Sequence, residues 1–256
     1  MSSAPTTPAT DPAKAALIAL HRGLERLGPG SDAVSRDILK ALPRLPSPPR
    51  LADLGCGSGA ASLMLAAHFQ APVLAVDLSA EFLGDLAHRA AARGLGALIR
   101  PVLADMGALD WPEASLDLLW SEGAAYNLGF AGALGAWRRL LAPLGVAVVS
   151  ELSWHVPNPP EEAAAYWRAA YPDVSDEAGN RARAEAAGYR LLGLRRLPRQ
   201  AWWDSYYDPL LARIAKLRPG GSPELAEAIA ETETEIDIFR RFGDSYGYTF
   251  YILGAD

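Results

Sequence analysis

The pattern of hydrophobic and polar positions between residues 50 and 154 predicts alternating strands and helices. Short, nearly continuous apolar runs are typical of strands buried on both faces, and here they alternate with stretches whose apolar residues recur at helical spacing. The expected strands are RLADLG, APVLAVDL, ALIRPVLAD, LDLLWSE and VAVVSELSW, and the expected helices are SLMLAAHF, EFLGDLAHRAAARG and GALGAWRRLLA. This order predicts a doubly wound, parallel α/β sheet.

The segments before this alternation have a different composition. Residues 1–12 hold Ser, Thr, Pro and Ala with almost no large apolar side chain, so we expect a disordered tail. Helical spacing predicts one helix from Ala13 to about Leu27, which the sequence Gly-Pro-Gly would end, and a second helix over about 32–42. The proline-rich stretch that follows predicts a stiff connector to the first strand.

The segments after Trp154 predict a helical insertion followed by further strands. Residues 157–187 have helical spacing, YRLLGLRRL has the pattern of a strand, and the aromatic-rich segment WWDSYY comes next. A long amphipathic helix is expected over about 222–242, and its acidic content favours packing on the core over binding to a membrane. The run Tyr246–Leu253 predicts a final strand.

Composition and charge exclude several classes of protein. The 256 residues are 50% hydrophobic and 21% charged, which is typical of a soluble globular domain. A net charge of −6 argues against nucleic acid as an obligate partner. The sequence shows no secretory signal and no run of about 18 apolar residues, so we expect a cytoplasmic protein without a membrane partner. The single cysteine, Cys56, excludes a disulfide framework and a cysteine-built metal site.

A glycine-rich loop after the first expected strand is the strongest chemical signal. The segment LADLGCGSG is an apolar strand with an acid near its end, followed by a Gly-x-Gly-x-Gly loop. Glycines let the chain turn sharply and let a ligand approach the backbone, and the N-terminus of the next helix favours an anionic group. Gly55, Gly57 and Ala60 also fit the dinucleotide fingerprint G-x-G-x-x-G/A, so the loop alone leaves an NAD(P)-dependent oxidoreductase open.

Acidic residues close the expected strands at one edge of the sheet. Asp53, beside the glycine loop, would repel a pyrophosphate and attract an amino acid's ammonium group. Asp77 ends the second strand, where a carboxylate can bind ribose hydroxyls. Asp105 ends the third strand, where it can read an adenine edge together with the next backbone N–H, and Glu122 ends the fourth strand. The position of Asp53 favours an amino-acid-bearing ligand over a dinucleotide.

The motifs ADLGCGSG, AVDLS, LADM, LDLLWSEGAAYNLGF and LLAPLGVAVVSE resemble the successive motifs of class I S-adenosylmethionine-dependent methyltransferases. The resemblance covers about residues 50–151, and SEGAAYNLGF, WDSYY and YGYTFYIL extend it to one subgroup of small bacterial methyltransferases. It implies a mostly parallel, seven-stranded, Rossmann-like methyltransferase fold with helical insertions and an antiparallel last strand. It also implies S-adenosyl-L-methionine as the cofactor.

The resemblance further implies a single methyltransferase domain beyond the tail. Residues 13–49 would form lid-like N-terminal helices and residues 50–153 the cofactor-binding core. Residues 154–245 would hold strands and insertions on the acceptor side, and residues 246–256 the terminal strand. The motifs end at the insertions, so they do not identify the acceptor.

The resemblance assigns cofactor contacts to individual residues. Asp53 and the loop Gly55–Gly59 would hold the methionine part of the cofactor, and Asp77 would bind the ribose hydroxyls. Leu78 would pack on the adenine, and Asp105 with Met106 would read its exocyclic nitrogen. The full set of expected cofactor-binding residues is Asp53, Gly55, Cys56, Gly57, Ser58, Gly59, Asp77, Leu78, Asp105, Met106 and Glu122.

A second set of residues falls where an acceptor would bind. Methyl transfer mainly needs two reactants held in line, and it needs a base only if the nucleophile loses a proton. We take Glu122 and His155 as candidate catalytic residues and Asp204 as a further base, whereas His21 lies in a helical stretch and is expected to be solvated. The aromatic segment 202–207 forms either an acceptor wall or the core of the insertion. The candidate substrate-binding residues are Tyr126, Asn127, Trp154, Trp203 and Tyr206.

The sequence predicts one function and leaves two alternatives. The predicted function is S-adenosylmethionine-dependent methyl transfer to a small-molecule acceptor, without a metal because no His, Asp or Glu cluster has metal-binding spacing. The alternatives are the NAD(P)-dependent oxidoreductase and a cofactor-binding protein that regulates a partner without catalysis. The sequence leaves open whether the chain forms a homodimer.

Overall fold

The computed structural model describes residues 11–255 of the chain. Its strands are β1 (Leu51–Leu54), β2 (Val73–Asp77), β3 (Ile99–Leu103), β4 (Leu116–Ser121), β5 (Leu141–Trp154), β6 (Ser175–Asp176), β7 (Tyr189–Arg196) and β8 (Tyr246–Ala255). Seven of them form one sheet in the order β3-β2-β1-β4-β5-β8-β7, and β6 pairs with the end of β5. Strands β1 to β5 are parallel, and β8 runs antiparallel to β5 and β7. The predicted, mostly parallel sheet is confirmed.

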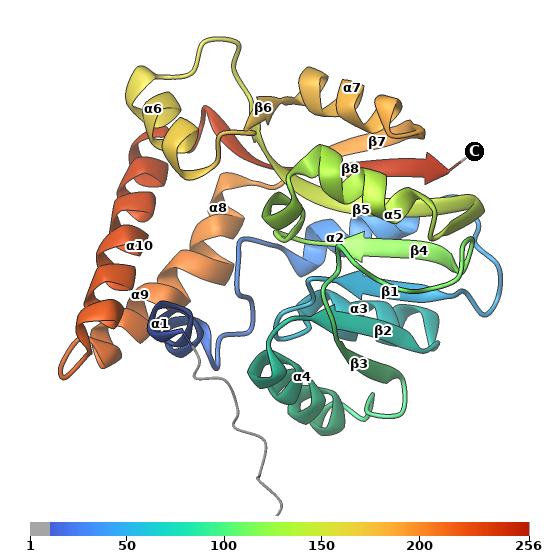
Figure 1. Ribbon diagram of the computed structural model, residues 1–256, viewed down its shortest axis with the longest axis horizontal. Coiled ribbons are helices and arrows are strands. Elements are labelled where there is room, and N and C mark those ends of the chain that lie inside the picture. Colours follow the sequence, from blue (N-terminus) through green and yellow to red (C-terminus); the bar gives the residue numbers. More distant parts are fainter. Residues whose placement is uncertain (1–10, 256) are drawn as a thin grey trace, which may run out of the picture.

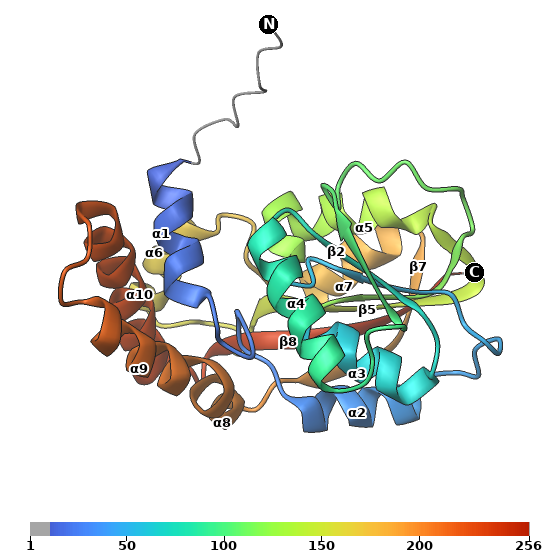
Figure 2. The same cartoon turned by 90° about the horizontal axis from the view of Figure 1, so that it is seen from below.

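Helices cover both faces of this sheet (Figure 2). They are α1 (Pro12–His21), α2 (Asp32–Ala41), α3 (Ala60–Phe69), α4 (Ala80–Ala92), α5 (Phe130–Arg138), α6 (Glu161–Ala170), α7 (Glu177–Ala186), α8 (Arg199–Trp202), α9 (Asp208–Leu217) and α10 (Pro223–Phe242), with a 3₁₀ turn η1 (Ala125–Leu128) and a π-helical turn η2 (Trp203–Tyr207). Helices α2, α3 and α4 contribute to one buried hydrophobic cluster, and α5 and α7 contribute to a second. The sheet therefore lies between two apolar layers.

Both faces of the sheet are apolar because side chains alternate along each strand. In β4, Leu118 and Trp120 join the cluster beneath α2–α4, whereas Leu119 joins the cluster beneath α5 and α7. In β1, Leu51 and Leu54 divide between the clusters in the same way. Full burial of each large apolar side chain contributes about 1.5–3 kcal/mol. Burial on both sides explains why these strands form continuous apolar runs in the sequence.

A second group of helices, α1, α6, α8, α9 and α10, lies beyond the carboxyl ends of the parallel strands (Figure 1). Helix α1 packs against α9 and α10, although these helices come from opposite ends of the described chain. The aromatic segment 202–207 builds the core of this group, since Trp202 and Tyr207 are fully buried and Trp202 stacks on Phe239 with 4.3 Å between ring centroids. None of the described helices is long and apolar enough to cross a membrane.

The N-terminal segment differs from its prediction. Residues 1–10 of the expected tail lie outside the described residues, and α1 begins at Pro12 with Asp11 as its N-cap. The helix ends at His21 and does not continue to Leu27, because Gly23 takes a left-handed φ of 84° that a helix cannot contain. The chain then runs irregularly across the glycine loop. The expected insertion over 157–187 also differs, because its second helix, α7, packs on the main sheet.

Candidate active site

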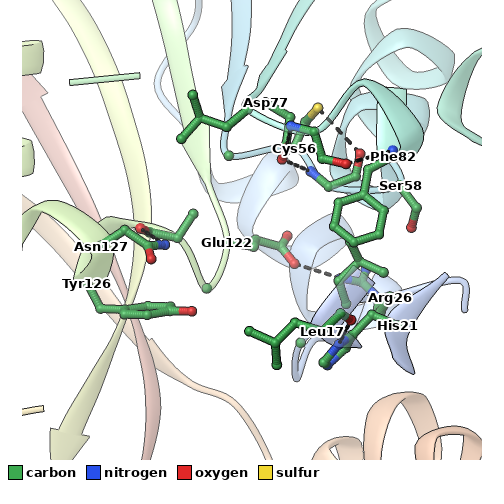
Figure 3. A pocket seen from close by; sticks show the side chains of 18 of the residues that line it. Leu17, His21, Arg26, Cys56, Ser58, Asp77, Phe82, Glu122, Tyr126 and Asn127 are labelled. Carbon is green, nitrogen blue, oxygen red and sulfur yellow. Dashed lines mark hydrogen bonds and ion pairs between the residues drawn. The ribbon is translucent and has the colours of Figure 1, made fainter. Parts of the chain in front are cut away.

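One cavity of about 850 Å³ lies at the carboxyl ends of β1, β2 and β4 (Figure 3). The strand ends and the glycine loop line one side of it, and helices α1 and α10 line the other. Ligands of doubly wound α/β proteins bind at this edge of the sheet, because the loops that follow the strands meet there. The cavity is therefore the candidate active site.

The glycine loop forms a tight turn between β1 and α3. Gly55 and Gly57 have φ values of 71° and 52°, a region that side chains with a Cβ avoid. A Cβ on Gly55 would lie 2.3 Å from the Cβ of Ala124, and one on Gly57 would lie 2.8 Å from a methyl group of Leu27. The turn and its close neighbours thus require glycine at both positions.

Asp53 is a buried acid with a free oxygen at the cavity wall. Its side chain is 1% exposed, and Oδ2 accepts a hydrogen bond of 2.6 Å from the Ser62 hydroxyl. Oδ1 has no hydrogen-bond partner among the residues that the structure describes. Burial raises the pKa of Asp53 to about 7. A ligand that donates to Oδ1, above all a cationic one, would compensate the cost of burying this carboxyl group.

The ends of β2 and β3 contribute two further carboxylates to the cavity. Asp77 accepts hydrogen bonds from the backbone N–H groups of Gly57 at 2.8 Å and Ser79 at 2.9 Å, so it also holds the glycine loop in place. Asp105 accepts one from the N–H of Gly107 at 2.8 Å. Next to Asp77, Leu78 lines the cavity with 62% of its surface exposed. An exposed leucine in a cleft offers an apolar face to a ligand.

Glu122 lines the cavity but is surrounded by donors. Its carboxylate accepts a hydrogen bond from Arg26 at 2.7 Å (Figure 3). It also accepts from the Ser35 hydroxyl and from the Trp120 indole N–H, each at 2.8 Å. The side chains of Glu122 and Arg26 are 8% and 9% exposed. Arg26 also binds Asp32 at 2.6 Å. The structure therefore gives Glu122 a connecting role between β4, α2 and the N-terminal segment, besides its place at the cavity.

The N-terminal segment supplies residues that the sequence analysis did not assign to the site. Ser58 donates to the carbonyl groups of Leu24 and Glu25, each at 3.2 Å, and Arg89 donates to the Glu25 carbonyl at 2.9 Å. These bonds fix the irregular chain across the glycine loop, where Arg26 reaches Glu122. Because none of these contacts is local in sequence, no motif signals them.

His21 lies in the cavity wall, contrary to its expected solvated position. Its Nδ1 donates to the backbone carbonyl of Leu17 at 2.9 Å, and its Nε2 accepts from the Tyr206 hydroxyl at 3.1 Å. Burial lowers the pKa of His21, so the ring is neutral at neutral pH. The helical spacing of Leu17, Ile18 and His21 is the signal that could have placed them on one face, and all three line the cavity.

The acceptor candidates divide between the cavity and the core. Tyr126, Asn127 and Tyr206 line the cavity, and Figure 3 shows Tyr126 and Asn127 on the side opposite His21. Tyr166 and Glu235 join this wall, although the sequence analysis did not single them out. Both come from helices whose partners are distant in sequence.

Several expected site residues lie outside the cavity. His155, directly after β5, bonds the Thr249 hydroxyl at 3.2 Å. Trp154 packs on Tyr246, and Trp203 packs on Tyr207 and Phe239. Asp204 accepts a hydrogen bond from Gln200. Gly59 turns its free side toward Leu86 instead of the cavity. The remaining expected cofactor residues, Asp53, Gly55, Cys56, Gly57, Ser58, Asp77, Leu78, Asp105, Met106 and Glu122, all line it.

Two further observations bear on the chemistry of the cavity. Burial raises the pKa of the Cys56 thiol well above its usual range, so this cysteine is a poor nucleophile. Among residues 11–255, no group of three or more His, Cys, Asp or Glu side chains is arranged to hold a metal ion. The polar groups available to a ligand are therefore mainly carboxylates, tyrosines and the neutral His21.

Comparisons with known proteins agree with this geometry. Residues 51–145 match the model of a family described as a methyltransferase domain. A SAM-dependent methyltransferase from Thiobacillus denitrificans, in complex with S-adenosyl-L-homocysteine, is 21% identical with a TM-score of 0.79, and the match covers 93% of this chain and 97% of that chain. One from Geobacter sulfurreducens, also in complex with S-adenosyl-L-homocysteine, is 19% identical with a TM-score of 0.80, and the match covers 94% and 98%.

Geranyl diphosphate C-methyltransferase from Streptomyces coelicolor A3(2) is 16% identical with a TM-score of 0.61, and the match covers 88% of this chain and 77% of that chain. No curated protein matches the sequence significantly. These likenesses confirm the predicted fold, and the domain match confirms the expected methyltransferase class for residues 51–145. Neither finding supports the oxidoreductase alternative. The narrower subgroup that the motif SEGAAYNLGF suggested stays a prediction.

Proposed function

We propose that this protein transfers a methyl group from S-adenosyl-L-methionine to a small-molecule acceptor. The observation that supports this most is the buried carboxyl group of Asp53, whose Oδ1 has no partner among the described residues beside the glycine loop. A pyrophosphate placed there would repel this carboxylate. The ammonium group of a methionine moiety would supply the missing donor and the opposite charge.

The other strand ends suit the remaining parts of the cofactor. A carboxylate can accept about four hydrogen bonds, so Asp77 keeps sites for two ribose hydroxyls beside its bonds to Gly57 and Ser79. The exposed Leu78 suits one face of an adenine ring. Asp105 and Met106 line the cavity next to it and are assigned to the adenine edge. The residues present therefore fit the cofactor that the resemblance implies.

The protein's part in the reaction is positioning. When bound, S-adenosyl-L-methionine supplies a methyl group that its sulfonium charge has already activated. The N-terminal segment crosses the glycine loop and α1 lines the cavity, and both reduce the access of water to a bound ligand. Tyr126, Asn127 and Tyr206 provide a polar and aromatic wall for the acceptor. Holding two reactants in line can lower the barrier by about 7–11 kcal/mol.

A small molecule suits the size of this site. A cavity of about 850 Å³ falls in the range of ligand pockets, and one structural neighbour is named for a small acceptor, geranyl diphosphate. The domain division, with residues 13–49 as a lid, is part of the same proposal. It is supported by the contacts of Leu24, Glu25 and Arg26 across the glycine loop and Glu122.

Calorimetric titration of the purified protein with S-adenosyl-L-homocysteine tests the proposal, with NADH in a parallel cell. We expect micromolar binding of the first ligand and none of the second. Asp53→Asn should weaken binding at least tenfold, because the amide lacks the charge that faces the ammonium group. Asp37→Asn, on the exposed side of α2, is the matched control. Binding of NADH alone would favour the oxidoreductase, and tight cofactor binding without turnover of any acceptor would favour a regulatory protein.

A further inference from the structure

The half of the cavity away from the glycine loop has an unusual charge balance. Glu231 and Glu235 of α10 line it together with Tyr126, Tyr166 and Tyr206. Across the whole cavity, the described side chains with a permanent positive charge are those of Lys14 and Arg26, against the carboxylates Asp53, Asp77, Asp105, Glu122, Glu231 and Glu235. Arg26 is already paired with Glu122 and Asp32. This excess of negative charge disfavours an acceptor that carries a carboxylate or a phosphate.

The charge of Glu235 acts on three of the tyrosines that line the cavity. Its Oε1 accepts a hydrogen bond of 2.7 Å from the Tyr207 hydroxyl, and no described Lys, Arg or His forms an ion pair with it. Burial raises the pKa of Glu235. Burial, and after it the charge of Glu235, also raises the pKa of Tyr126, Tyr166 and Tyr206. A buried acid without a cation, beside three aromatic rings, suits a cationic ligand.

His21 presents an unprotonated nitrogen to the same region. A carbonyl oxygen only accepts hydrogen bonds, so the bond from Nδ1 to Leu17 fixes the proton of the neutral ring on Nδ1. Nε2 therefore carries the lone pair, and the Tyr206 hydroxyl donates to it at 3.1 Å. Tyr206 is thus coupled to both groups, since its hydroxyl bonds His21 and the charge of Glu235 adds to the raised pKa of that hydroxyl.

We propose that the acceptor is a primary or secondary amine on an apolar body, that the field of Glu235 draws its ammonium form into the cavity, and that Nε2 of His21 takes the proton that the nitrogen loses. The inference rests on the proposed function. The apolar part of the acceptor would lie against Leu17 and Ile18 of α1 and against the tyrosine rings. The nitrogen would lie beside the Tyr206 hydroxyl, within reach of Nε2.

The step balances in atoms and charge. The ammonium group gives one proton to the Tyr206 hydroxyl oxygen while that hydroxyl passes its own proton to Nε2 of His21, and the freed nitrogen lone pair forms the bond to the methyl carbon. The carbon–sulfur bond breaks with its electron pair on sulfur, so the sulfonium becomes a neutral thioether. The methylated nitrogen leaves as an ammonium ion, and the proton on His21 passes to solvent. No oxidant, reductant or metal is needed.

Three probes with one apolar body test the class of acceptor: phenethylamine, 2-phenylethanol and 3-phenylpropionate. Each is titrated into protein saturated with S-adenosyl-L-homocysteine, and this saturation is itself the check on the proposed function. We expect the amine to bind at least tenfold tighter than the alcohol, and the carboxylate to bind weakest. Glu235→Gln should reduce the preference for the amine about tenfold, whereas Glu227→Gln, exposed on the same helix, should not change it.

Turnover with S-adenosyl-L-methionine tests His21. His21→Gln should keep the affinity for S-adenosyl-L-homocysteine within twofold and lower the rate of amine methylation at least 100-fold, the range of general base catalysis. His88→Gln is the matched control, because His88 makes the same bond to the carbonyl four residues earlier, outside the cavity.

Two results would overturn the inference while the proposed function stands: equal or tighter binding of the carboxylate, and an unchanged amine rate in His21→Gln. If none of the probes is methylated, the class of acceptor is decided by the order of their affinities and by the effect of Glu235→Gln on that order. If S-adenosyl-L-homocysteine does not bind at all, the proposed function fails first.

Discussion

Breaking the buried ion pair between Arg26 and Glu122 should destabilise the whole molecule. Both side chains are more than nine-tenths buried, and the pair joins the N-terminal segment to the end of β4. The substitution Arg26→Gln leaves the carboxylate of Glu122 buried without its cation. Two neutral donors, Ser35 and Trp120, still form hydrogen bonds to Oε1 of Glu122, so the carboxylate is not left without partners.

The expected loss of unfolding free energy follows from the number of hydrogen-bond partners that Glu122 keeps. Removing one partner of a buried ion pair costs about 3–5 kcal/mol, and the two remaining hydrogen bonds favour the lower end, about 3 kcal/mol. For a domain of this size each kcal/mol shifts the midpoint of thermal unfolding by about 2–4 °C, so the midpoint should fall by about 6–12 °C. Arg36→Gln is the matched control, because Arg36 makes a longer, exposed pair with Asp32 at 3.7 Å and should cost at most about 0.5 kcal/mol.

Urea titration followed by tryptophan fluorescence, with differential scanning calorimetry, measures both variants. The double variant Arg26→Gln/Glu122→Gln should lose less than the sum of the single losses, because neither charge is then left alone. A loss of unfolding free energy in Arg26→Gln no larger than that in Arg36→Gln, about 0.5 kcal/mol, would refute the reasoning. A Glu122→Gln variant that keeps full stability but loses turnover would give Glu122 the catalytic role predicted from the sequence.

Three further predictions concern the loop, a helix cap and a buried acid. Asp77→Ala should weaken binding of S-adenosyl-L-homocysteine by about 1–3 kcal/mol, since it removes charge-assisted bonds, and an unchanged dissociation constant in calorimetry would contradict the assignment. Gly59→Ala should lower the free energy of unfolding in urea titration by about 2–4 kcal/mol, because φ is +83° and the new Cβ would lie 2.1 Å from Leu86. Gly84→Ala is the control: it has open space around it inside α4, and the alanine should raise the free energy of unfolding by about 0.5–1 kcal/mol. Burial raises the pKa of Glu151 from 4.5 to about 8, so the native state holds a proton that the unfolded state releases, and between about pH 5 and pH 8 stability should fall with rising pH by at most ~1.4 kcal/mol per unit. Glu151→Gln should remove the part of this slope that Glu151 causes, whereas Asp53, whose pKa burial also raises, keeps its own part; equal slopes in both proteins would show that Glu151 does not contribute.

The cofactor half of the site could be predicted from the sequence because its signals are local. Asp53, Asp77 and Asp105 each follow an apolar strand, and parallel strands bring their carboxyl ends to one edge of a sheet. The glycines at positions 55 and 57 by themselves predict a tight turn. These residues needed no knowledge of distant packing, and the structure places all of them in the cavity.

The acceptor half could not be predicted in the same way because it depends on contacts between the two ends of the described chain. His21 faces the cavity only because α1 packs against α9 and α10. Helical spacing shows which residues share a face, but it does not show what that face meets. The same reason explains why the prediction for Trp154 and Trp203 was wrong. Their aromatic character suits a binding wall, but they pack against Tyr246 and Phe239 in the core.

The position of β8 in the sheet has a consequence for how the protein is made. Among the described strands, β7 pairs only with β8, and β8 lies between β5 and β7. A growing chain emerges from the ribosome with β7 first, so β7 has no place in the sheet until β8 follows, and the edge of β5 stays open during that interval. Helix α1 is synthesised before α9 and α10, but it can take its packed position only after both have been made. The face that carries His21 and Glu235 therefore assembles only after α10 has been made, shortly before β8 completes the sheet.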